Sequence, residues 1–237
     1  MPSSALKCIE SWKKFLPGYE LVRWDEAKID VNAIPYASEA YKARRYAFVS
    51  DWARLKILYE EGGLYFDTDV ELIKPLDHII AAGPFMGQES DPLARYGRLN
   101  VAPGLGMAFE PGHPFLKKAL ALYEGLSFLL PDGSPNLTTT VRYITGLLEE
   151  SGLKPAPGIL ECEGIKIYPK EYFCPRSPES PRLHLTANTV SIHHYDGSWL
   201  KPTLFSRLRA LAIRCFGRSF YEGLRAWKRS LFKQSGA

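Results

Sequence analysis

Residues 61–70, which read Glu-Gly-Gly-Leu-Tyr-Phe-Asp-Thr-Asp-Val, constrain the fold of this chain more than any other segment. They end a stretch at 45–61 in which apolar side chains recur with helical spacing, and the two glycines are a helix stop signal. A short apolar strand at 64–67 is expected to follow. Because alternate residues of an extended segment point to the same side, Asp67 and Asp69 are expected to converge on one divalent cation.

Apolar spacing and turn residues predict several further elements. Helices are expected at 6–15, 114–125 and 137–151, and strands at 19–24 and within 188–199. Helix followed by strand, repeated early in the chain, favours an α/β sheet, in which ligands bind beyond the carboxyl ends of the strands. Gly104 and Gly106 lack a following phosphate-binding helix, so we expect them to mark close backbone packing.

The composition predicts an ordered, globular protein. The chain has 237 residues, of which 46% are hydrophobic and 24% charged, enough for one sizeable domain with a buried core. No apolar run approaches the ~18 residues of a membrane span, and the N-terminus lacks the blocks of a signal peptide, which favours a cytoplasmic protein. The four cysteines form no C-x-x-C pair and are expected to be free thiols.

Charge is divided unevenly along the chain. Residues 203–237 contain eight of the 30 basic residues but one of the 26 acidic ones, which leaves 1–202 mildly acidic. A mildly acidic main domain argues against nucleic acid as a partner. We therefore expect a domain at 1–202 and a basic amphipathic tail at 203–237. This tail either contacts an anionic membrane or packs its apolar stripe on the domain.

The carboxylates of Asp67 and Asp69 are oxygen ligands of the kind that Mg²⁺ and Mn²⁺ accept. A cation held there would neutralise a departing diphosphate, which suits the activation of a nucleotide-sugar. A solvated surface turn is the alternative for an isolated Asp-x-Asp, but the glycine turn and the apolar strand favour the metal site. His193 and His194 are adjacent, so only one can face the site from a strand; that one is either a further metal ligand or a structural histidine.

Three more residues are candidates for holding a donor. Asp51 and Arg54 lie three apart on one face of the 45–61 helix, where a carboxylate can accept hydrogen bonds from sugar hydroxyls and a guanidinium can donate them. An acid favoured by the helix dipole and paired with a surface arginine is the open alternative. The indole N–H of Trp199 can close on a phosphate or a sugar ring.

These segments resemble the glycosyltransferases whose sugar-binding region contains a DXD motif, of the bacterial capsular polysaccharide type (glycosyltransferase family 32-like). The resemblance covers most of residues 5–200. It rests on Ala-Leu-Lys-Cys-Ile-Glu-Ser-Trp at 5–12, Arg-Trp-Asp at 23–25, Phe-Val-Ser-Asp at 48–51 with Arg54, Gly-Gly-Leu-Tyr-Phe-Asp-Thr-Asp-Val at 62–70, and Ser-Ile-His-His-Tyr at 191–195 with Ser198 and Trp199.

The resemblance implies a Rossmann-like GT-A domain that binds a nucleotide-diphosphate sugar, with a UDP-sugar expected, and that uses Mn²⁺ or Mg²⁺. Relatives open with a strand before the helix at 6–15; this sequence begins after it, so the domain is expected to lack its first strand. The implied catalytic residues are Asp67, Asp69, Asp51 and Arg54, the implied donor-binding residues are Asp51, Arg54, Asp67 and Trp199, and the implied metal ligands are Asp67, Asp69 and His193 or His194.

The implied reaction is transfer of a sugar, with retention at the anomeric carbon, to a saccharide or lipid-linked saccharide in surface polysaccharide or glycolipid assembly. No protein nucleophile emerges from the sequence, so we expect same-face attack in which the leaving phosphate accepts the acceptor's proton. The expected location is the cytoplasm, with peripheral contact at the inner face of the plasma membrane. A sugar-nucleotide-binding protein without turnover is the alternative, because the strand expected to be missing helps to hold the nucleotide base.

Overall fold

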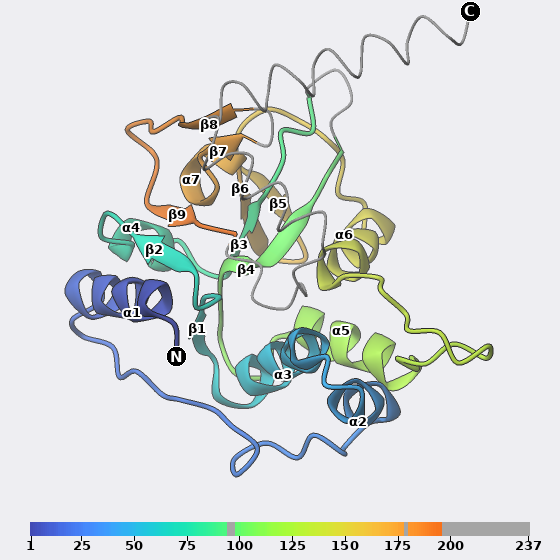
Figure 1. Ribbon diagram of the computed structural model, residues 1–237. Coiled ribbons are helices and arrows are strands. Elements are labelled where there is room, and N and C mark those ends of the chain that lie inside the picture. The colour runs from blue at the N-terminus through green and yellow to red at the C-terminus, as the bar shows by residue number, and fades with distance from the viewer. Residues whose placement is uncertain (94–97, 178–179, 196–237) are drawn as a thin grey trace, which may run out of the picture. The chain divides into compact units, whose positions relative to one another are not determined.

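The computed structural model describes residues 1–93, 98–177 and 180–195, and Figure 1 shows how their helices and strands are arranged. The helices are α1 (Ser3–Phe15), α2 (Pro35–Lys42), α3 (Tyr46–Glu61), α4 (Asp77–Ile80), α5 (Pro114–Glu124), α6 (Thr140–Glu150) and α7 (Lys170–Phe173). The strands are β1 (Gly63–Tyr65), β2 (Val70–Leu72), β3 (Phe85–Gln88), β4 (Val101–Phe109), β5 (Leu160–Cys162), β6 (Ile165–Tyr168), β7 (Arg176–Ser177), β8 (Ser180–Leu183) and β9 (Ser191–His193).

The chain divides into two compact units, Met1–Asp196 and Gly197–Ala237. The second unit lies outside the described residues. The predicted tail at 203–237 and the predicted donor-binding residue Trp199 lie there too, so both remain predictions.

A five-stranded mixed sheet, in the order β1-β4-β3-β6-β5, forms the centre of the first unit. Strand β4 is antiparallel to both β1 and β3, and β3 is parallel to β6. The expected α/β class is therefore confirmed. Strands β1, β3 and β6 run in the same direction, so their carboxyl ends reach the same edge of the sheet.

Every residue of β4 is buried, because helices cover both faces of the sheet. Met107 and Phe109 enter an apolar cluster with α2, α3, α5 and α6. Leu105 and Ala108 enter a second cluster that includes side chains of α1, α4, α7 and β2. Figure 1 shows α2, α3 and α5 side by side on the first of these faces.

Helix α3 confirms the pattern at 45–61, and it positions one side of the site. Its apolar side buries Phe48, Trp52 and Leu55 between α2 and α5. It ends at Gly62, where φ is 70° and a Cβ would press against Pro111. A residue with a side chain would be strained at this position, so the glycine lets the chain reverse directly from α3 into β1.

The helices predicted at 6–15, 114–125 and 137–151 are confirmed as α1, α5 and α6, but the strand predicted at 19–24 is wrong. In the described residues this segment has no strand partner, and its side chains Leu21 and Val22 are 45% and 48% exposed. An alternating pattern becomes a strand only where a neighbouring strand supplies hydrogen bonds and an apolar face.

The strand predicted at 64–67 is β1, but it ends at Tyr65, before the first aspartate. The N–H of Val70 donates to the carbonyl of Asp67 at 2.9 Å, so residues 67–70 form a turn between β1 and β2. Strand alternation is therefore not what orients Asp67 and Asp69. The strand expected within 188–199 is β9, which pairs antiparallel with β2.

Two predictions from composition can be compared with the described residues. Cys8, Cys162 and Cys174 are buried free thiols, as expected, and Cys215 lies outside the described residues. Among the helices of the described ranges, none combines the length and the apolar character that crossing a membrane requires.

Candidate functional site

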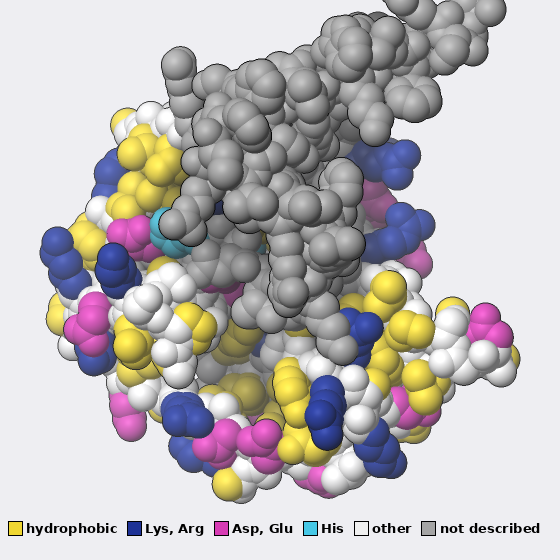
Figure 2. Space-filling model, in the orientation of Figure 1, with side chains coloured by type: hydrophobic (Ala, Val, Ile, Leu, Met, Phe, Trp, Pro, Cys, Tyr) yellow, Lys and Arg dark blue, Asp and Glu magenta, His cyan; other side chains and the backbone are white. Residues whose placement is uncertain are grey.

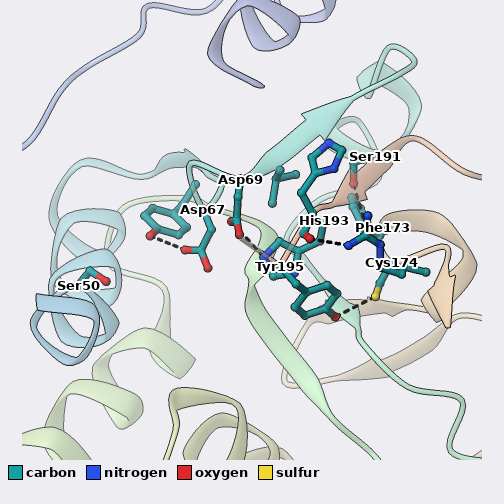
Figure 3. Close-up of polar contacts among 12 residues, drawn as sticks. Ser50, Asp67, Asp69, Phe173, Cys174, Ser191, His193 and Tyr195 are labelled. Atoms are coloured by element: carbon teal, nitrogen blue, oxygen red, sulfur yellow. Dashed lines mark hydrogen bonds and ion pairs between the residues drawn. The ribbon is translucent and has the colours of Figure 1, made fainter. Parts of the chain in front are cut away.

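The turn between β1 and β2 brings two carboxylates to the tip of β9. One ligand atom each from Asp67, Asp69 and His193 lies within 4.8 Å of the others. Figure 3 shows Asp69 and His193 pointing toward one another, with Asp67 beside them. The register of β2 and β9 explains the meeting, since it pairs Val70 with His193 and so sets the imidazole next to the turn.

The donor set of this group fits a divalent cation. Two carboxylates and one imidazole offer oxygen and nitrogen ligands, which suit Mg²⁺ or Mn²⁺. Nε2 of His193 lies 3.1 Å from Oδ1 of Asp69, so a ligand nitrogen already faces a ligand oxygen. The other ring nitrogen, Nδ1, is buried and has no hydrogen-bond partner among the described residues.

The two adjacent histidines have different partners. Nε2 of His194 lies 2.8 Å from Oε2 of Glu71, so the His194 side chain is outside the group of three potential ligands. Its backbone N–H donates to the carbonyl of Asp69 at 2.9 Å, which closes the β2–β9 pair against the turn. Of the two imidazoles, His193 is thus the one placed with the aspartates, while His194 pairs with Glu71, an acid to which the sequence assigned no role.

Arg54 joins the turn to α3. Its Nη1 lies 3.1 Å from Oδ1 of Asp67, and its Nη2 lies 2.9 Å from Oδ1 of Asp51. Its Nε also donates to the backbone carbonyl of Ser50 at 2.9 Å. The Arg54 side chain is 5% exposed, so the alternative of a surface arginine does not hold. The ion pairs instead form a row from the buried Asp51 and Arg54 on the helix to the partly exposed Asp67, a candidate metal ligand.

Burial and charge act in opposite directions in this row. Burial alone would lower the pKa of Arg54, but Asp67, Tyr65 and Asp51 outweigh it and hold the pKa above its usual value. For Asp51, burial raises the pKa to about 6, against the opposing effects of Arg54 and of the Thr140 backbone N–H. The carboxyl of Asp51 therefore titrates near neutral pH, as groups at functional sites often do.

Tyr65 is a site residue that the sequence reasoning left without a role. Its hydroxyl donates to Oδ1 of Asp67 at 2.8 Å, and the Arg54 guanidinium carbon lies 4.7 Å from the centre of its ring. Burial raises its pKa well above the usual value, so the phenol remains a hydrogen-bond donor. Its position two residues before Asp67, which would share a face with Asp67 in the strand expected at 64–67, was the available signal.

Gly104 allows Asp67 to lie against the sheet. In the pairing of β3 with β4, Met86 matches Met107 but Gly87 matches Ala102, so residues 103–106 bulge from the ladder. The carbonyl of Gly104 accepts the N–H of Asp67 at 3.0 Å, and a Cβ on this glycine would overlap the Asp67 carboxylate. The expectation of close backbone packing at this glycine pair is confirmed.

Helix α1 supports the turn from its other side. The indole N–H of Trp12 donates to the carbonyl of Val70 at 2.7 Å, and the Ser11 hydroxyl accepts the N–H of Leu72 at 2.9 Å. Both contacts hold β2, the strand that follows Asp69. Residues 5–12, the first segment of the resemblance, are therefore structurally coupled to the turn.

Comparison with known proteins is consistent with this geometry. Residues 2–86 match the family model described as glycosyltransferase sugar-binding region containing DXD motif. Inositol phosphoceramide mannosyltransferase 1 of Schizosaccharomyces pombe is 30% identical over 111 residues, which cover 44% of this chain and 31% of that protein. Subversion of eukaryotic traffic protein A of Legionella pneumophila subsp. pneumophila is 27% identical over an alignment of 114 residues, and the match covers 36% of this chain and 18% of that protein.

The matched part of this chain spans less than a third of the length of either relative. The matched family region contains α1, α3 and the turn with Asp67 and Asp69. The enzyme class expected from the sequence, a glycosyltransferase, is supported by these findings, and the mixed α/β sheet fits a GT-A-like domain. The narrower assignment to family 32 and capsular synthesis remains a prediction.

Proposed function

We propose that this chain is a metal-dependent retaining glycosyltransferase. It moves a sugar from a nucleotide-diphosphate donor, with a UDP-sugar expected, to a saccharide or lipid-linked saccharide acceptor. One observation carries the proposal: Asp67, Asp69 and His193 gather within 4.8 Å, next to the buried Arg54, and both aspartates lie inside the matched glycosyltransferase sugar-binding region. A donor of this kind needs a cation for its diphosphate and hydrogen-bonding groups for its sugar, and the site offers both.

In this proposal Asp67, Asp69 and His193 hold Mn²⁺ or Mg²⁺, which supplies Lewis-acid neutralisation of the departing diphosphate when it is bound. Asp51 accepts hydrogen bonds from hydroxyls of the donor. Arg54 is committed to Asp51, Asp67 and the carbonyl of Ser50, so its main task is to fix the two carboxylates relative to each other. This fixed geometry holds the donor for attack by the acceptor.

Retention follows from same-face attack, in which the acceptor's oxygen bonds to the anomeric carbon as the bond to the diphosphate breaks. The leaving phosphate accepts the acceptor's proton. Trp199 is proposed to close over the diphosphate; it lies outside the described residues.

The proposal extends to setting and partners. We infer action in surface polysaccharide or glycolipid assembly at the cytoplasmic side of the membrane, with the basic residues of 203–237 contacting anionic lipid. Nucleic acid is not an expected partner. On the face shown in Figure 2, basic and acidic side chains of the described residues are interspersed, whereas nucleic-acid-binding proteins gather basic side chains on one face.

A donor panel tests the function. We expect wild-type protein to release nucleotide from one UDP- or GDP-sugar in the presence of Mn²⁺ and to stop after chelation. Asp69→Asn should release nucleotide at least about 100-fold more slowly than wild type, because an amide oxygen is a weaker metal ligand than a carboxylate oxygen. This effect exceeds the usual effect of removing an outer-shell partner. Its melting temperature should stay the same. Asp77→Asn, in the first turn of α4, is the matched control and should keep full activity.

Equal nucleotide release by Asp69→Asn and wild type would refute the metal assignment. Binding of a donor with Mn²⁺ but without release, in the presence of varied saccharide acceptors, would favour the alternative of a sugar-nucleotide-binding protein. Binding is measured by calorimetry on the same samples, so the two outcomes separate without a further variant.

A further inference from the structure

Glu89 lies at the same edge of the sheet as the candidate metal ligands. Strand β3 ends at Gln88, and its parallel partner β6 ends at Tyr168, with Gly87 paired to Tyr168. Glu89 and Lys170 each follow this pair by two residues, just as Asp67 follows the end of β1 by two. Because β1, β3 and β6 run in the same direction, all three charged side chains leave the sheet at one edge.

The backbone of Glu89 is held in place. Its N–H donates to the carbonyl of Asn100 at 3.0 Å, and its carbonyl accepts from Sγ of Cys174 at 3.8 Å. The same sulfur lies 3.0 Å from the hydroxyl of Tyr195, whose ring centre lies 4.0 Å from that of His193. Figure 3 shows the Tyr195 hydroxyl linked to Cys174 and its ring beside His193. This chain of contacts connects the end of β3 to the imidazole.

His193 has one ring nitrogen without a partner. Nε2 faces Asp69, whereas Nδ1 is buried and has no hydrogen-bond partner among the described residues. A buried ring nitrogen without a partner loses its hydration without compensation. A histidine that ligates a metal through one nitrogen nearly always donates its other N–H to a carboxylate, carbonyl or water. The imidazole of His193 therefore needs an acceptor on its Nδ1 side.

The carboxylate of Glu89 is the candidate for this acceptor, because it interacts electrostatically with His193. Its side chain is half-buried, and among neighbouring charges His193 acts on it most, followed by Lys170. Burial raises the pKa of Glu89, and electrostatic interactions with His193 and Lys170 oppose that rise. A carboxylate with little solvation gains from each hydrogen bond it accepts.

We propose that Glu89 is a positioning residue that accepts a hydrogen bond from Nδ1–H of His193 and thereby leaves the Nε2 lone pair for the divalent cation. The inference rests on the proposed metal-dependent function. Without the cation, a neutral imidazole with its proton on Nε2 would donate to Oδ1 of Asp69 across the 3.1 Å contact. With a cation bound, the tautomer protonated on Nδ1 would leave Nε2 free to ligate; this change of tautomer releases one proton from Nε2 and takes up one at Nδ1, so the proton count is unchanged.

Two measurements on the full chain test this role. Mn²⁺ affinity is followed by titration, and the histidine tautomers are followed by two-bond proton–nitrogen spectra with diamagnetic Mg²⁺. Glu89→Leu should weaken Mn²⁺ binding by about 10–100-fold, the usual effect of removing an outer-shell partner. Glu89→Gln keeps an acceptor oxygen and should weaken Mn²⁺ binding by less than about 10-fold. Glu161→Leu, which replaces an exposed acid on β5, should bind Mn²⁺ as wild type does.

In wild type, Mg²⁺ should move the His193 proton from Nε2 to Nδ1. His113 is the internal reference, because its Nδ1 accepts the N–H of Phe115 and so keeps its proton on Nε2 throughout. Wild-type affinity in both Glu89 variants, or a His193 proton that stays on Nε2 with Mg²⁺ bound, would overturn this inference alone. Failure of wild type to bind either cation would overturn the proposed metal site and the inference with it.

Discussion

Replacing Asp51 by asparagine should remove a pH dependence from the stability of the fold. Burial raises the pKa of Asp51 from 3.8 to about 6, even though Arg54 opposes the rise. A pKa difference of this size corresponds to about 3 kcal/mol in favour of the protonated carboxyl in the folded state. Asparagine has the shape of that protonated carboxyl and carries no charge, so the variant avoids the cost of ionising a buried group.

The sign of the pH dependence follows from proton binding. Between pH 4 and pH 6 the folded state keeps a proton on Asp51 that the unfolded state has released, so the free energy of unfolding of the wild type falls as pH rises through this window. The difference between Asp51→Asn and wild type should therefore be near zero at pH 4. It should grow to about 3 kcal/mol by pH 8, apart from a constant offset for the amide.

Urea unfolding at intervals from pH 4 to pH 8 measures this difference. Glu149→Gln, which removes an exposed charge from α6, should give a flat difference over the same range. A flat curve for Asp51→Asn, or one that falls with pH, would refute the reasoning from burial. In the proposed function the same variant should also bind the donor more weakly.

Three further predictions concern the support of the turn. Gly104→Ala should displace the Asp67 carboxylate, lower Mn²⁺ affinity and lower the free energy of unfolding by about 1–3 kcal/mol. The control Gly146→Ala, with open space around its Cβ, should stabilise α6 by up to about 1 kcal/mol. Urea unfolding and Mn²⁺ titration measure both effects. Arg54→Lys should lower the rate of donor turnover by at least about 10-fold, because an ammonium group cannot bind two carboxylates in the fixed geometry of a guanidinium. An unchanged turnover rate would contradict this. Trp12→Phe removes a hydrogen bond to β2 and should destabilise the fold by about 1 kcal/mol in thermal unfolding; an unchanged transition would count against the coupling of α1 to the turn.

Features that depend on neighbouring residues could be predicted from the sequence. The apolar spacing of 45–61 and the glycine stop at Gly62 predicted α3 and its end, because helix periodicity and a positive φ are set within a few residues. The four long helices outside 35–42 were all found in this way. The motif of Asp67 and Asp69 pointed to a cation for the same reason, since both ligands belong to one short segment.

Features that depend on how strands pair could not be predicted from the sequence. The strand predicted at 19–24 has no strand partner among the described residues. Strand β1 ends before Asp67 because a turn leads to β2, so the aspartates converge for a different reason from the one expected. The bulge that brings Gly104 against Asp67 depends on how β4 aligns with β3. Local patterns do not encode such alignments.

The sequence by itself determined the main helices, the glycine turn and the two acids that follow it. Only the tertiary structure decided which histidine joins Asp67 and Asp69, because the antiparallel register of β2 and β9 places His193 beside the turn and His194 against Glu71. It also decided that Arg54 is buried between two carboxylates. Helix and turn preferences act over a few residues, whereas contacts between residues far apart in sequence arise only when the sheet and its covering helices are assembled.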